Sequence, residues 1–496
     1  MKVGDVADLG RLVQGDPARE VTGVTADSRQ VTPGAAFVAI RGLRADGHDF
    51  VGEAAARGAA LVVVERAVPA PAGVAVLEVP SSRRALAAIA ARFHGHPSRR
   101  LRVIGVTGTN GKTTTTHLIR AILKAAGHPT GLIGTVRNWV VDEALPVVHT
   151  TPEAPELQAL LARMVDAGAH HAVMEVSSHA LALHRTDELE FDIGVFTNLT
   201  QDHLDFHGDM DAYREAKGIL FRRLGEGVKP GPKAAVLGAD DPASAYYRSL
   251  CRVPVLTYGV RERADVRAED IRIEPEGAAY TLVTPGGSAR LHLQFTGLFN
   301  VYNSLAAAAT AVVEGIPLDV IQGALEATGG VDGRMEAVRA GQPFGVFVDY
   351  AHTPDGLENV LRAVRAFARG RVIVVFGAGG DRDPTKRAPM GRIAARLADY
   401  AVITSDNPRT EDPESIVRQV EQGFLEVAPA GDRHEVRVDR TEAIARAVEI
   451  ARPGDVVVIA GKGHETYQIV GDRRIPFDDR EVARRAIQAR LAGRSA

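Results

Sequence analysis

Short, nearly continuous apolar runs recur along the chain, and stretches with helical spacing separate them. In the last third these runs are "GVFVDYAH", "RVIVVFGAGG", "YAVITSDN" and "DVVVIAGKGHE". Runs rich in valine and isoleucine that alternate with helices are typical of a parallel sheet covered on both faces. Ligands bind such sheets beyond the carboxyl ends of the strands. The Gly, Asp, His and Asn residues that end these runs therefore mark the predicted location of the chemistry.

The same pattern divides the chain into three predicted domains. Residues 1–98 mix short strand-like runs, such as "AAFVAIRG" and "AALVVVER", with turns. Residues 99–331 open with a strand, a glycine-rich loop and a helix, and they end in "ATGGVDGR", which we interpret as a linker. Residues 332–496 hold the runs quoted above. At 496 residues the chain is too long for a single core, and the predicted fold class is α/β with a Rossmann-like C-terminal domain.

Composition mainly excludes classes of protein. A net charge of −3 with both signs interspersed gives no electrostatic footprint for nucleic acid. The single cysteine, Cys251, excludes an internal disulfide and any zinc or iron–sulfur site built from several cysteines. No apolar run approaches the roughly 18 residues that span a bilayer, and Asp5 and Asp8 interrupt the start where a signal peptide would be apolar. We expect a cytoplasmic protein that does not insert into membranes, and a monomer.

The segment "GVTGTNGKTTTT" (105–116) is a variant of the phosphate-binding loop. The standard pattern G-x-x-x-x-G-K-[ST] would place its first glycine at position 106, where this chain has a valine. The other parts are present, because Gly108 and Gly111 let backbone N–H groups face an anion. Lys112 can reach a terminal phosphate, and the hydroxyl of Thr113 can bind Mg2+. Its place between a strand and a helix favours a nucleotide site over a glycine-rich turn without a ligand.

The loop "GVTGTNGKTTT" resembles that of the Mur ligase family, the ATP-dependent amide-bond-forming enzymes of peptidoglycan synthesis; folylpolyglutamate synthase carries a related loop. The resemblance extends over almost the whole chain. It implies an N-terminal α/β domain that binds a uridine diphosphate group, a central ATP-binding domain with a mostly parallel sheet, and a C-terminal domain that binds an amino acid. ATP and Mg2+ are the implied cofactors. The implied ATP-binding residues are Gly108, Thr109, Asn110, Gly111, Lys112, Thr113, Thr114, Asn300, Asp349 and His352.

Two segments of the central zone supply candidate metal ligands. Glu175 ends the run "HAVMEV", and "TQDHLDFHGDMDAYREAKG" brings acidic residues, histidines and a lysine close together. Taken alone, the second segment is a solvated loop followed by an amphipathic helix. The resemblance implies instead that Thr113 and Glu175 hold one Mg2+, while His203 and a carbamylated Lys217 (N6-carboxylysine) serve a second. Carbamylation replaces an ammonium that repels Mg2+ with an anion that binds it. The implied catalytic residues are Lys112, Glu175, His203 and Lys217.

Segments in the first and second zones resemble the acceptor site of the family. "HTTPEA" (149–154) matches positions that hold the acceptor peptide and its sugar phosphate. "TADSRQVTPGAAFVAIRGLRADGHDF" resembles the uridine-diphosphate site of one branch of the family. That match argues against folylpolyglutamate synthase, whose acceptor carries no uridine nucleotide. The implied contacts to the UDP-linked substrate are Ser28, Leu43, Arg44, Ala45, His149, Thr150, Thr151, Ser177 and Arg185.

The segment "SDNPRTEDP" follows a predicted strand and indicates which amino acid is added. Arg409 offers a planar fork for a carboxylate, and Asp406 can accept hydrogen bonds from an ammonium group. "DNPR" resembles the signature of family members that add meso-diaminopimelate, whose far end is itself an amino-acid head group. The implied contacts to diaminopimelate are Arg382, Asp406, Asn407, Pro408, Arg409, Gly461 and Glu465.

The predicted reaction is an ATP-dependent ligation with two small-molecule substrates. It adds meso-diaminopimelate to the D-glutamate side chain of UDP-N-acetylmuramoyl-L-alanyl-D-glutamate through an acyl phosphate. The nearest alternative is the same ligation with L-lysine or L-ornithine. More distant alternatives are a ligase like folylpolyglutamate synthase and a nucleotide-binding switch without ligase chemistry.

Overall fold

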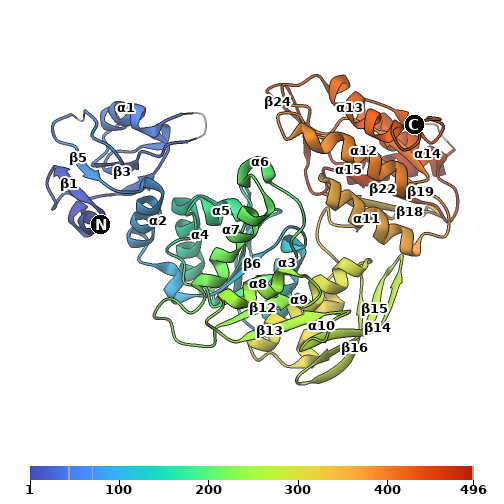
Figure 1. The fold of residues 1–496 in the computed structure, drawn as a ribbon, viewed down its shortest axis with the longest axis horizontal. Helices are drawn as coiled ribbons and strands as arrows, with labels where there is room; N and C mark the ends of the chain where they lie inside the picture. The colour runs from blue at the N-terminus through green and yellow to red at the C-terminus, as the bar shows by residue number, and fades with distance from the viewer. Residues whose placement is uncertain (43–44, 70, 494–496) are drawn as a thin grey trace.

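The computed structural model describes residues 1–42, 45–69 and 71–493. Figure 1 shows an N-terminal lobe (blue) and a C-terminal lobe (orange to red), both above a central lobe that joins them. Each lobe is built on its own sheet, of five, eleven and six strands in chain order. The predicted α/β class with three domains is confirmed. Within the described ranges, no helix is long and apolar enough to cross a membrane.

The N-terminal sheet has the strand order β1-β5-β4-β3-β2. Only β1 runs antiparallel to its neighbour. Strands β3 and β4 lie within the two apolar runs noted in the sequence, and all of their residues are buried. The elements are η1 (Val3–Leu9), β1 (Arg11–Gln14), β2 (Gly23–Thr25), η2 (Ser28–Gln30), β3 (Ala35–Val38), η3 (Gly47–Phe50), α1 (Val51–Ala56), β4 (Leu61–Val64), β5 (Ala75–Glu78), α2 (Ser82–Phe93) and η4 (Pro97–Arg100).

The first half of the central domain carries the phosphate loop at a point where the strand order reverses. Strand β6 lies between β10 and β11 and is parallel to both, so the chain continues on one side of β6 and later returns on the other. Such a reversal opens a crevice at the carboxyl ends of the strands. The elements are β6 (Arg102–Thr107), α3 (Lys112–Ala125), β7 (Thr130–Ile133), β8 (Asn138–Val140), β9 (Glu143–Leu145), α4 (Ala154–Asp166), β10 (His171–Glu175), α5 (Ser178–Ala182), β11 (Ile193–Phe196), α6 (Leu204–His207) and α7 (Met210–Arg223).

The second half of the central domain extends the sheet with an antiparallel meander that the apolar runs did not predict. Strands β14, β15 and β16 pair antiparallel in sequence. Alternate residues such as Tyr280 and Leu282 pack with helix α9 in one apolar core. The elements are β12 (Ala234–Gly238), α8 (Ala243–Leu250), β13 (Val255–Gly259), β14 (Val266–Glu274), β15 (Gly277–Thr284), β16 (Gly287–Leu293), α9 (Leu298–Val313) and α10 (Leu318–Ala327).

The C-terminal sheet is parallel except for its edge strand β17, as its valine-rich runs predict. In β19, Val374 faces one apolar core while its neighbour Val375 faces another, so both faces are covered. The elements are β17 (Glu336–Ala337), β18 (Gly345–Asp349), α11 (Pro354–Phe367), β19 (Val372–Phe376), η5 (Pro384–Lys386), α12 (Arg387–Leu397), β20 (Tyr400–Ile403), α13 (Pro413–Leu425), β21 (His434–Val436), α14 (Arg440–Ile450), β22 (Val456–Ala460), β23 (Tyr467–Val470), β24 (Arg473–Pro476) and α15 (Asp479–Leu491).

Local sequence signals explain where the helices nearest the site begin. Helix α11 starts at a proline, and the side chain of Thr353 before it accepts the backbone N–H of Gly356. Proline at the first helical position and a hydroxyl cap before it are both favourable. Helix α7 begins in the same way at Asp209, whose carboxylate accepts the N–H of Ala212. These caps fix where the two helices begin, and residues of α11 line the central cavity.

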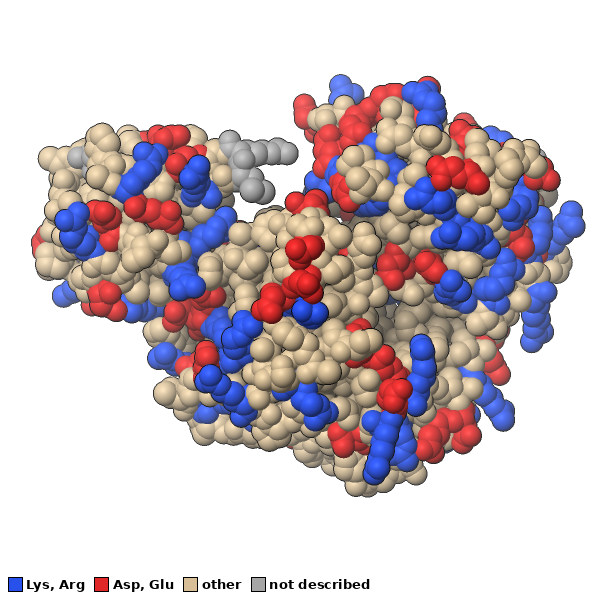
Figure 2. Space-filling model, viewed as in Figure 1, with Lys and Arg blue, Asp and Glu red and all other residues tan. Residues whose placement is uncertain are grey.

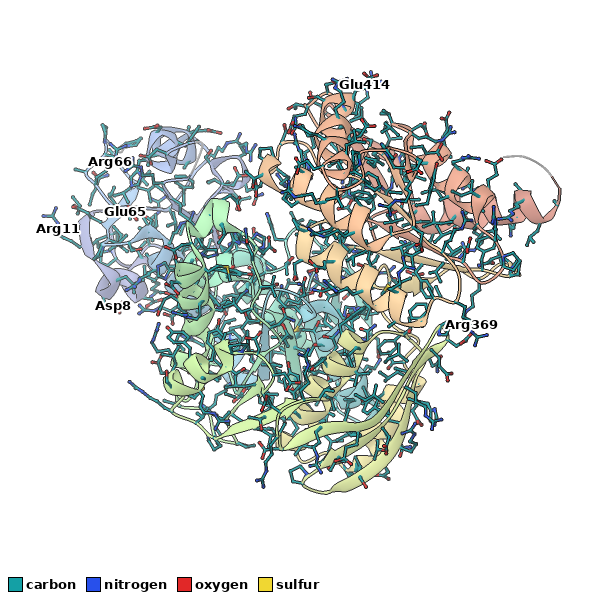
Figure 3. The ribbon with its side chains drawn as sticks, turned by 45° about the vertical axis from the view of Figure 1, so that its right-hand side comes forward. Asp8, Arg11, Glu65, Arg66, Arg369 and Glu414 are labelled. Atoms are coloured by element: carbon teal, nitrogen blue, oxygen red, sulfur yellow. The ribbon has the colours of Figure 1, made fainter. Side chains whose placement is uncertain are left out.

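Charged side chains are spread over the surface of all three lobes. Figure 2 shows lysine, arginine, aspartate and glutamate interspersed, with a hollow between the N-terminal lobe and the rest of the molecule. Figure 3 places Asp8 and Arg11 on the outside of the N-terminal lobe and Glu414 on the outside of the C-terminal lobe. The face in view has no single-sign field of the kind that nucleic-acid binding needs.

Candidate active site

A cavity of about 720 Å3 lies between the central and C-terminal domains, at the carboxyl ends of their strands. Of the predicted ATP-binding residues, all except Gly108 and Asn300 line it. Asn300 lies behind the cavity wall, where its amide donates to the carbonyl of Thr296 (2.8 Å) and accepts from Asn303 (3.1 Å). Asn303 lines the cavity in its place.

The glycines of the phosphate loop allow a close approach that no other residue permits. Gly108 and Gly111 have φ angles of 149° and 83°, in the range that favours glycine. A Cβ atom on Gly108 would overlap with the hydroxyl of Thr197, and one on Gly111 would overlap with the amide oxygen of Asn303. The position where the standard loop has its first glycine lies inside strand β6, where Val106 is a fully buried core residue. The valine that departs from the standard pattern therefore contributes to the apolar core of the central domain.

The side chain of Lys112 folds back onto the phosphate-binding loop. Its ammonium donates to the carbonyls of Gly108 (2.9 Å) and Thr109 (2.8 Å). Burial lowers its pKa, while the charge of Glu175 acts in the opposite direction. Lys112 thus lies at the N-terminus of helix α3, the kind of position where proteins bind phosphate groups.

Thr113 and Glu175 meet at the floor of the cavity, as the metal prediction requires. The hydroxyl of Thr113 donates to Glu175 Oε2 (3.2 Å), and Thr135 donates to the same carboxylate through its N–H (2.8 Å) and hydroxyl (3.0 Å). Hydroxyl and carboxylate oxygens are the hard ligands that Mg2+ prefers. Across the described residues, no three His, Cys, Asp or Glu side chains form a group that could hold a metal ion by themselves. A metal here would need oxygen atoms from phosphate or water as well.

Arg334, which the sequence reasoning placed in the linker, reaches the same threonine. Its guanidinium donates to the Thr113 hydroxyl (3.1 Å) and lies 4.8 Å from the ring centroid of Tyr350. A cation therefore lies against the proposed metal ligands from the side of the C-terminal domain. The residue gave no signal in the sequence beyond its place after a glycine-rich run.

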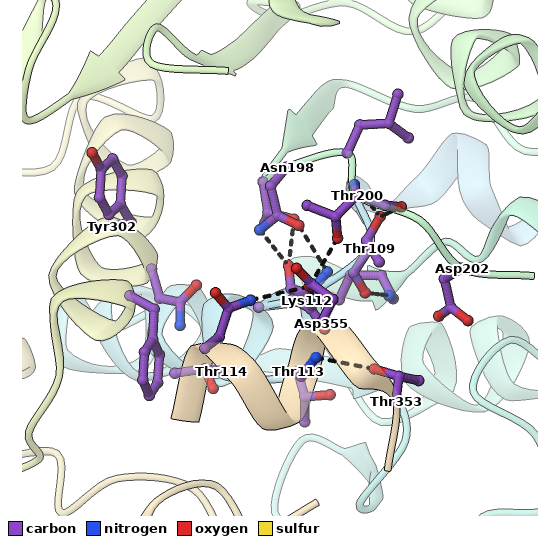
Figure 4. Close-up of a pocket in the computed structure, with 18 of the residues that line it drawn as sticks. Thr109, Lys112, Thr113, Thr114, Asn198, Thr200, Asp202, Tyr302, Thr353 and Asp355 are labelled. Carbon is purple, nitrogen blue, oxygen red and sulfur yellow. Dashed lines mark hydrogen bonds between the residues drawn. The ribbon is translucent and has the colours of Figure 1, made fainter. Parts of the chain in front are cut away.

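A second contact between the domains involves Asp355 at the start of helix α11. The sequence reasoning did not single out this residue either. Its carboxylate accepts from the Asn110 amide (2.5 Å) and from the Thr200 hydroxyl (2.9 Å). Figure 4 shows Asp355 facing Asn198 and Thr200 across the cavity. Burial raises the pKa of Asp355. The phosphate loop and the C-terminal domain are thus joined through a partly desolvated carboxylate.

His203 and Lys217 both lie near the ring of Tyr213. The ring centroids of His203 and Tyr213 are 6.2 Å apart, and Lys217 Nζ is 4.2 Å from the Tyr213 ring. Lys217 is 1% exposed, and its ammonium donates to the Gly108 carbonyl (2.9 Å). Burial, with a smaller contribution from Lys112, lowers the pKa of Lys217 well below its usual range. Loss of hydration also lowers the pKa of His203, which favours the neutral imidazole that binds metals.

The predicted acceptor residues of the central domain cluster beside Glu175. The hydroxyl of Thr151 donates to the Glu175 carbonyl (2.8 Å) and accepts the N–H of Ser177 (3.1 Å). Arg185 donates to the Thr151 carbonyl (2.9 Å), and Thr150 pairs with the hydroxyl of Thr135 (3.1 Å). His149 is exposed next to this cluster. These contacts lie next to the proposed metal site, where an acceptor carboxylate would have to arrive.

The N-terminal residues predicted to bind the uridine nucleotide are described only in part. Ser28 is buried, and its hydroxyl donates to Glu53 (3.1 Å). Ala45 is exposed, and its carbonyl accepts from Gly42 (2.9 Å). Leu43 and Arg44 lie outside the described residues.

The proposed diaminopimelate residues converge at the carboxyl edge of the C-terminal sheet. Asp406 and Asn407 are 5% exposed. The guanidinium of Arg409 donates to the Gly380 carbonyl (2.6 Å) in the loop after β19. That loop also carries Arg382, which is exposed. Gly461 at the end of β22 has a φ of 123°, and a Cβ atom there would lie 3.2 Å from Asp406 Oδ2.

Lys462 is a buried cation at the centre of this cluster, and the sequence reasoning did not single it out. Its ammonium donates to Asn407 Oδ1 (3.1 Å) and Glu465 Oε2 (2.9 Å) and lies 3.7 Å from Asp406 Oδ1. Asn407 also donates to Glu465 (2.9 Å). Within the described part of the chain, Asp406 Oδ1 is buried without a hydrogen-bond donor. A buried carboxylate oxygen of this kind is costly unless a ligand supplies the donor.

Asp349 and His352 follow strand β18 at the edge of the cavity. The Asp349 carboxylate accepts the backbone N–H groups of Met335 (2.7 Å) and Ala351 (2.8 Å), and burial raises its pKa. His352 Nδ1 lies 2.7 Å from the Tyr350 carbonyl, and burial lowers its pKa. Asp349 thus fixes the backbone just after the linker, and His352 lines the cavity.

The fold and the cavity define a nucleotide-dependent enzyme whose site is assembled between domains. Comparison with known proteins identifies the class more closely. The descriptions of the matching family models are "Mur ligase family, catalytic domain" for residues 20–94, "Mur ligase middle domain" for 106–311 and "Mur ligase, glutamate ligase domain" for 333–463. The chain belongs to the Mur ligase family, and it is an ATP-dependent ligase.

Three relatives show how far the similarity extends. The chain is 52% identical, over 95% of its length and 96% of the relative's, to UDP-N-acetylmuramoyl-L-alanyl-D-glutamate–2,6-diaminopimelate ligase of Geobacillus thermodenitrificans. A solved structure of a ligase with the same name is 34% identical, with a TM-score of 0.70 and 99% of both chains covered. The structure of MurF ligase from Thermotoga maritima in complex with ADP has a TM-score of 0.64 at 19% identity, over 95% of this chain and 98% of that one; it shares the fold.

The close approach at Gly111 makes a direct prediction. Gly111→Ala should weaken binding of ADP by about tenfold or more, because a φ of 83° and overlap with Asn303 force the loop out of its conformation. Fluorescence titration with a labelled ADP analogue measures this. Gly127→Ala is the matched control, since Gly127 has a φ of 80° but nothing within 4 Å of the added Cβ. Equal affinities in the two variants would contradict the role of the glycine.

Proposed function

We propose that this protein joins meso-diaminopimelate to the D-glutamate side-chain carboxylate of UDP-N-acetylmuramoyl-L-alanyl-D-glutamate at the expense of ATP, in the synthesis of peptidoglycan precursors. The observation that carries the choice of amino acid is the buried, donor-free oxygen of Asp406 in the same loop as the guanidinium of Arg409. An ammonium and a carboxylate on one carbon atom would satisfy both groups. The names of relatives that are about half identical support the same reaction.

The first proposed step forms an acyl phosphate. An oxygen of the acceptor carboxylate attacks the γ-phosphorus of ATP, a new P–O bond forms, and the bond to the bridging β,γ-oxygen breaks to release ADP. Lys112 and the N-terminus of helix α3 are placed to stabilise negative charge on the phosphates. Thr151 and Arg185 would position the acceptor beside Glu175. The contribution of these groups is mainly positioning.

The second proposed step forms the amide bond. The neutral amine of diaminopimelate attacks the acyl carbon, inorganic phosphate leaves with its oxygen, and the amine loses a proton. Asp406, Arg409 and Glu465 would hold the distant head group, so the other amine points toward the central domain. An arginine left without its carboxylate costs on the order of a few kcal/mol. That cost disfavours L-lysine and L-ornithine, which lack the second carboxylate.

The residues fit the divalent metal that the family implies. Thr113 and Glu175 would hold one Mg2+ together with phosphate oxygens, and His203 with Lys217 as its carbamate would hold a second. Bound Mg2+ neutralises charge on the phosphates during transfer. Because burial lowers the pKa of Lys217, this side chain favours the neutral amine that can take up carbon dioxide. The proposed location is the cytoplasm, and the proposed oligomeric state is a monomer.

Dependence of ATP turnover on both substrates tests the proposal against a nucleotide switch. ADP release should require the UDP-linked dipeptide and diaminopimelate together, and it should stay at background with either one alone. A coupled assay of ADP release with each combination measures this. Turnover of ATP in the absence of the acceptor would contradict the ligase mechanism.

Arg409→Ala tests the choice of amino acid. The KM for diaminopimelate should rise by about ten- to a hundredfold, because the carboxylate loses a charged partner, whereas the KM for ATP should stay unchanged. Arg418→Ala is the control, because Arg418 is 63% exposed on the surface of helix α13. An unchanged KM for diaminopimelate in Arg409→Ala would remove Arg409 from the site.

Lys217→Ala tests the modified lysine. Turnover should collapse, and small carboxylates such as acetate should restore part of it, because they can enter the space that the side chain leaves and supply the lost anion. Lys124→Ala, at an exposed ion pair with Asp142, should keep the wild-type rate with no response to acetate. Wild-type turnover in Lys217→Ala would exclude Lys217 from the mechanism.

A further inference from the structure

The hairpin of strands β23 and β24 lies directly behind the diaminopimelate loop. It forms a separate two-stranded sheet, and Figure 1 shows it at the edge of the C-terminal lobe that faces the N-terminal lobe. Its turn contains Gly471, with a φ of 58°. Val470 and Ile475 are 41% and 45% exposed, so the hairpin has little core of its own. A two-stranded hairpin is marginal in water without such support.

Hydrogen bonds attach this hairpin to the three key residues of the DNPR segment. Gln468 Nε2 donates to the Asp406 carbonyl (2.6 Å), and the Ile469 N–H donates to Asn407 Oδ1 (2.9 Å). The N–H of Arg409 donates to the Ile469 carbonyl (3.1 Å), and the Arg409 carbonyl accepts from Gly471 (2.7 Å). Both backbone polar groups of Arg409 are therefore held by the hairpin.

The conformation of Arg409 makes these bonds necessary. Its φ is 53°, in the left-handed region that an arginine adopts only when its surroundings impose it. In this conformation the side chain leaves the loop toward Gly379 and Gly380, and its guanidinium donates to the Gly380 carbonyl. Without the hairpin, nothing else on the backbone of Arg409 would hold it in place among the described residues.

We propose that hairpin β23–β24 is a specificity-determining element, in which Gln468 is a positioning residue for Asp406, while the backbone of Ile469 and Gly471 positions Arg409. The hairpin holds residues 406–409 in the arrangement that fits an amino-acid head group. Gln468 contributes to this arrangement without contacting the ligand itself. This inference rests on the proposed function, because it assumes that Arg409 binds the distant carboxylate. By reciprocity, a ligand held by Arg409 should stabilise the hairpin.

The test is a double-mutant cycle of Gln468→Ala and Asp406→Ala, with steady-state kinetics for diaminopimelate and for ATP. Gln468→Ala should raise the KM for diaminopimelate by about three- to tenfold, the effect of one lost hydrogen bond, with the KM for ATP and the melting temperature unchanged. In the Asp406→Ala background the same substitution should change the KM by less than about twofold, because the carboxylate that Gln468 positions is absent. Arg418→Ala, an exposed position on helix α13 outside the hairpin, should match the wild type.

Two outcomes would overturn the inference: an unchanged KM for diaminopimelate in Gln468→Ala, or an equal fold-change in both backgrounds. Gly471→Ala gives an independent check, since it strains the turn without meeting any atom within 4 Å, and it should raise the same KM. If Arg409→Ala itself leaves the KM unchanged, the proposed amino-acid site is wrong. If Arg409→Ala raises the KM for diaminopimelate but Gln468→Ala and Gly471→Ala leave it unchanged, the proposed amino-acid site is supported and the hairpin has no part in it.

Discussion

The carbonyl oxygen of Gly108 accepts hydrogen bonds from two lysines, and the rest of the site depends on this arrangement. Lys112 reaches it from the start of helix α3 and Lys217 from helix α7 (both 2.9 Å). Two buried ammonium groups around one carbonyl disfavour each other's charge. The backbone of Gly108 can lie close to Thr197 because glycine has no side chain that would overlap with the Thr197 hydroxyl. One glycine therefore joins the nucleotide loop, the end of strand β11 and the lysine proposed to be modified.

The site is completed by side chains that cross between domains. Arg334 contacts the phosphate-loop threonine, and Asp355 holds Asn110 and Thr200. Both bring charges into partly desolvated surroundings, where bound phosphates and metal would supply partners that the protein alone lacks. The same reasoning applies to Asp406, whose buried Oδ1 accepts no hydrogen bond from the described residues and has only the Lys462 ammonium nearby, at 3.7 Å. Substrates would thus contribute to the structure of the site as well as react in it.

Much of the fold follows from the sequence because its signals are local. The valine-rich runs mark strands β18, β19, β20 and β22, since burial on both faces demands continuous apolar residues. The meander of β14 to β16 gave a weaker signal, because only alternate residues face its core. Arg334, Asp355 and Lys462 were missed because their roles arise from contacts with residues far away in the chain. The sequence reasoning chose Asn300, which lies one helical turn from Asn303, the asparagine that lines the cavity.

The identity of the added amino acid tests the account most directly. The enzyme would receive ATP, Mg2+ and UDP-N-acetylmuramoyl-L-alanyl-D-glutamate with equal concentrations of meso-diaminopimelate, L-lysine and L-ornithine, and the mass of the product would be measured. The proposed roles of Asp406 and Arg409 predict a product that carries diaminopimelate almost exclusively. A product that carries mainly lysine or ornithine would contradict it.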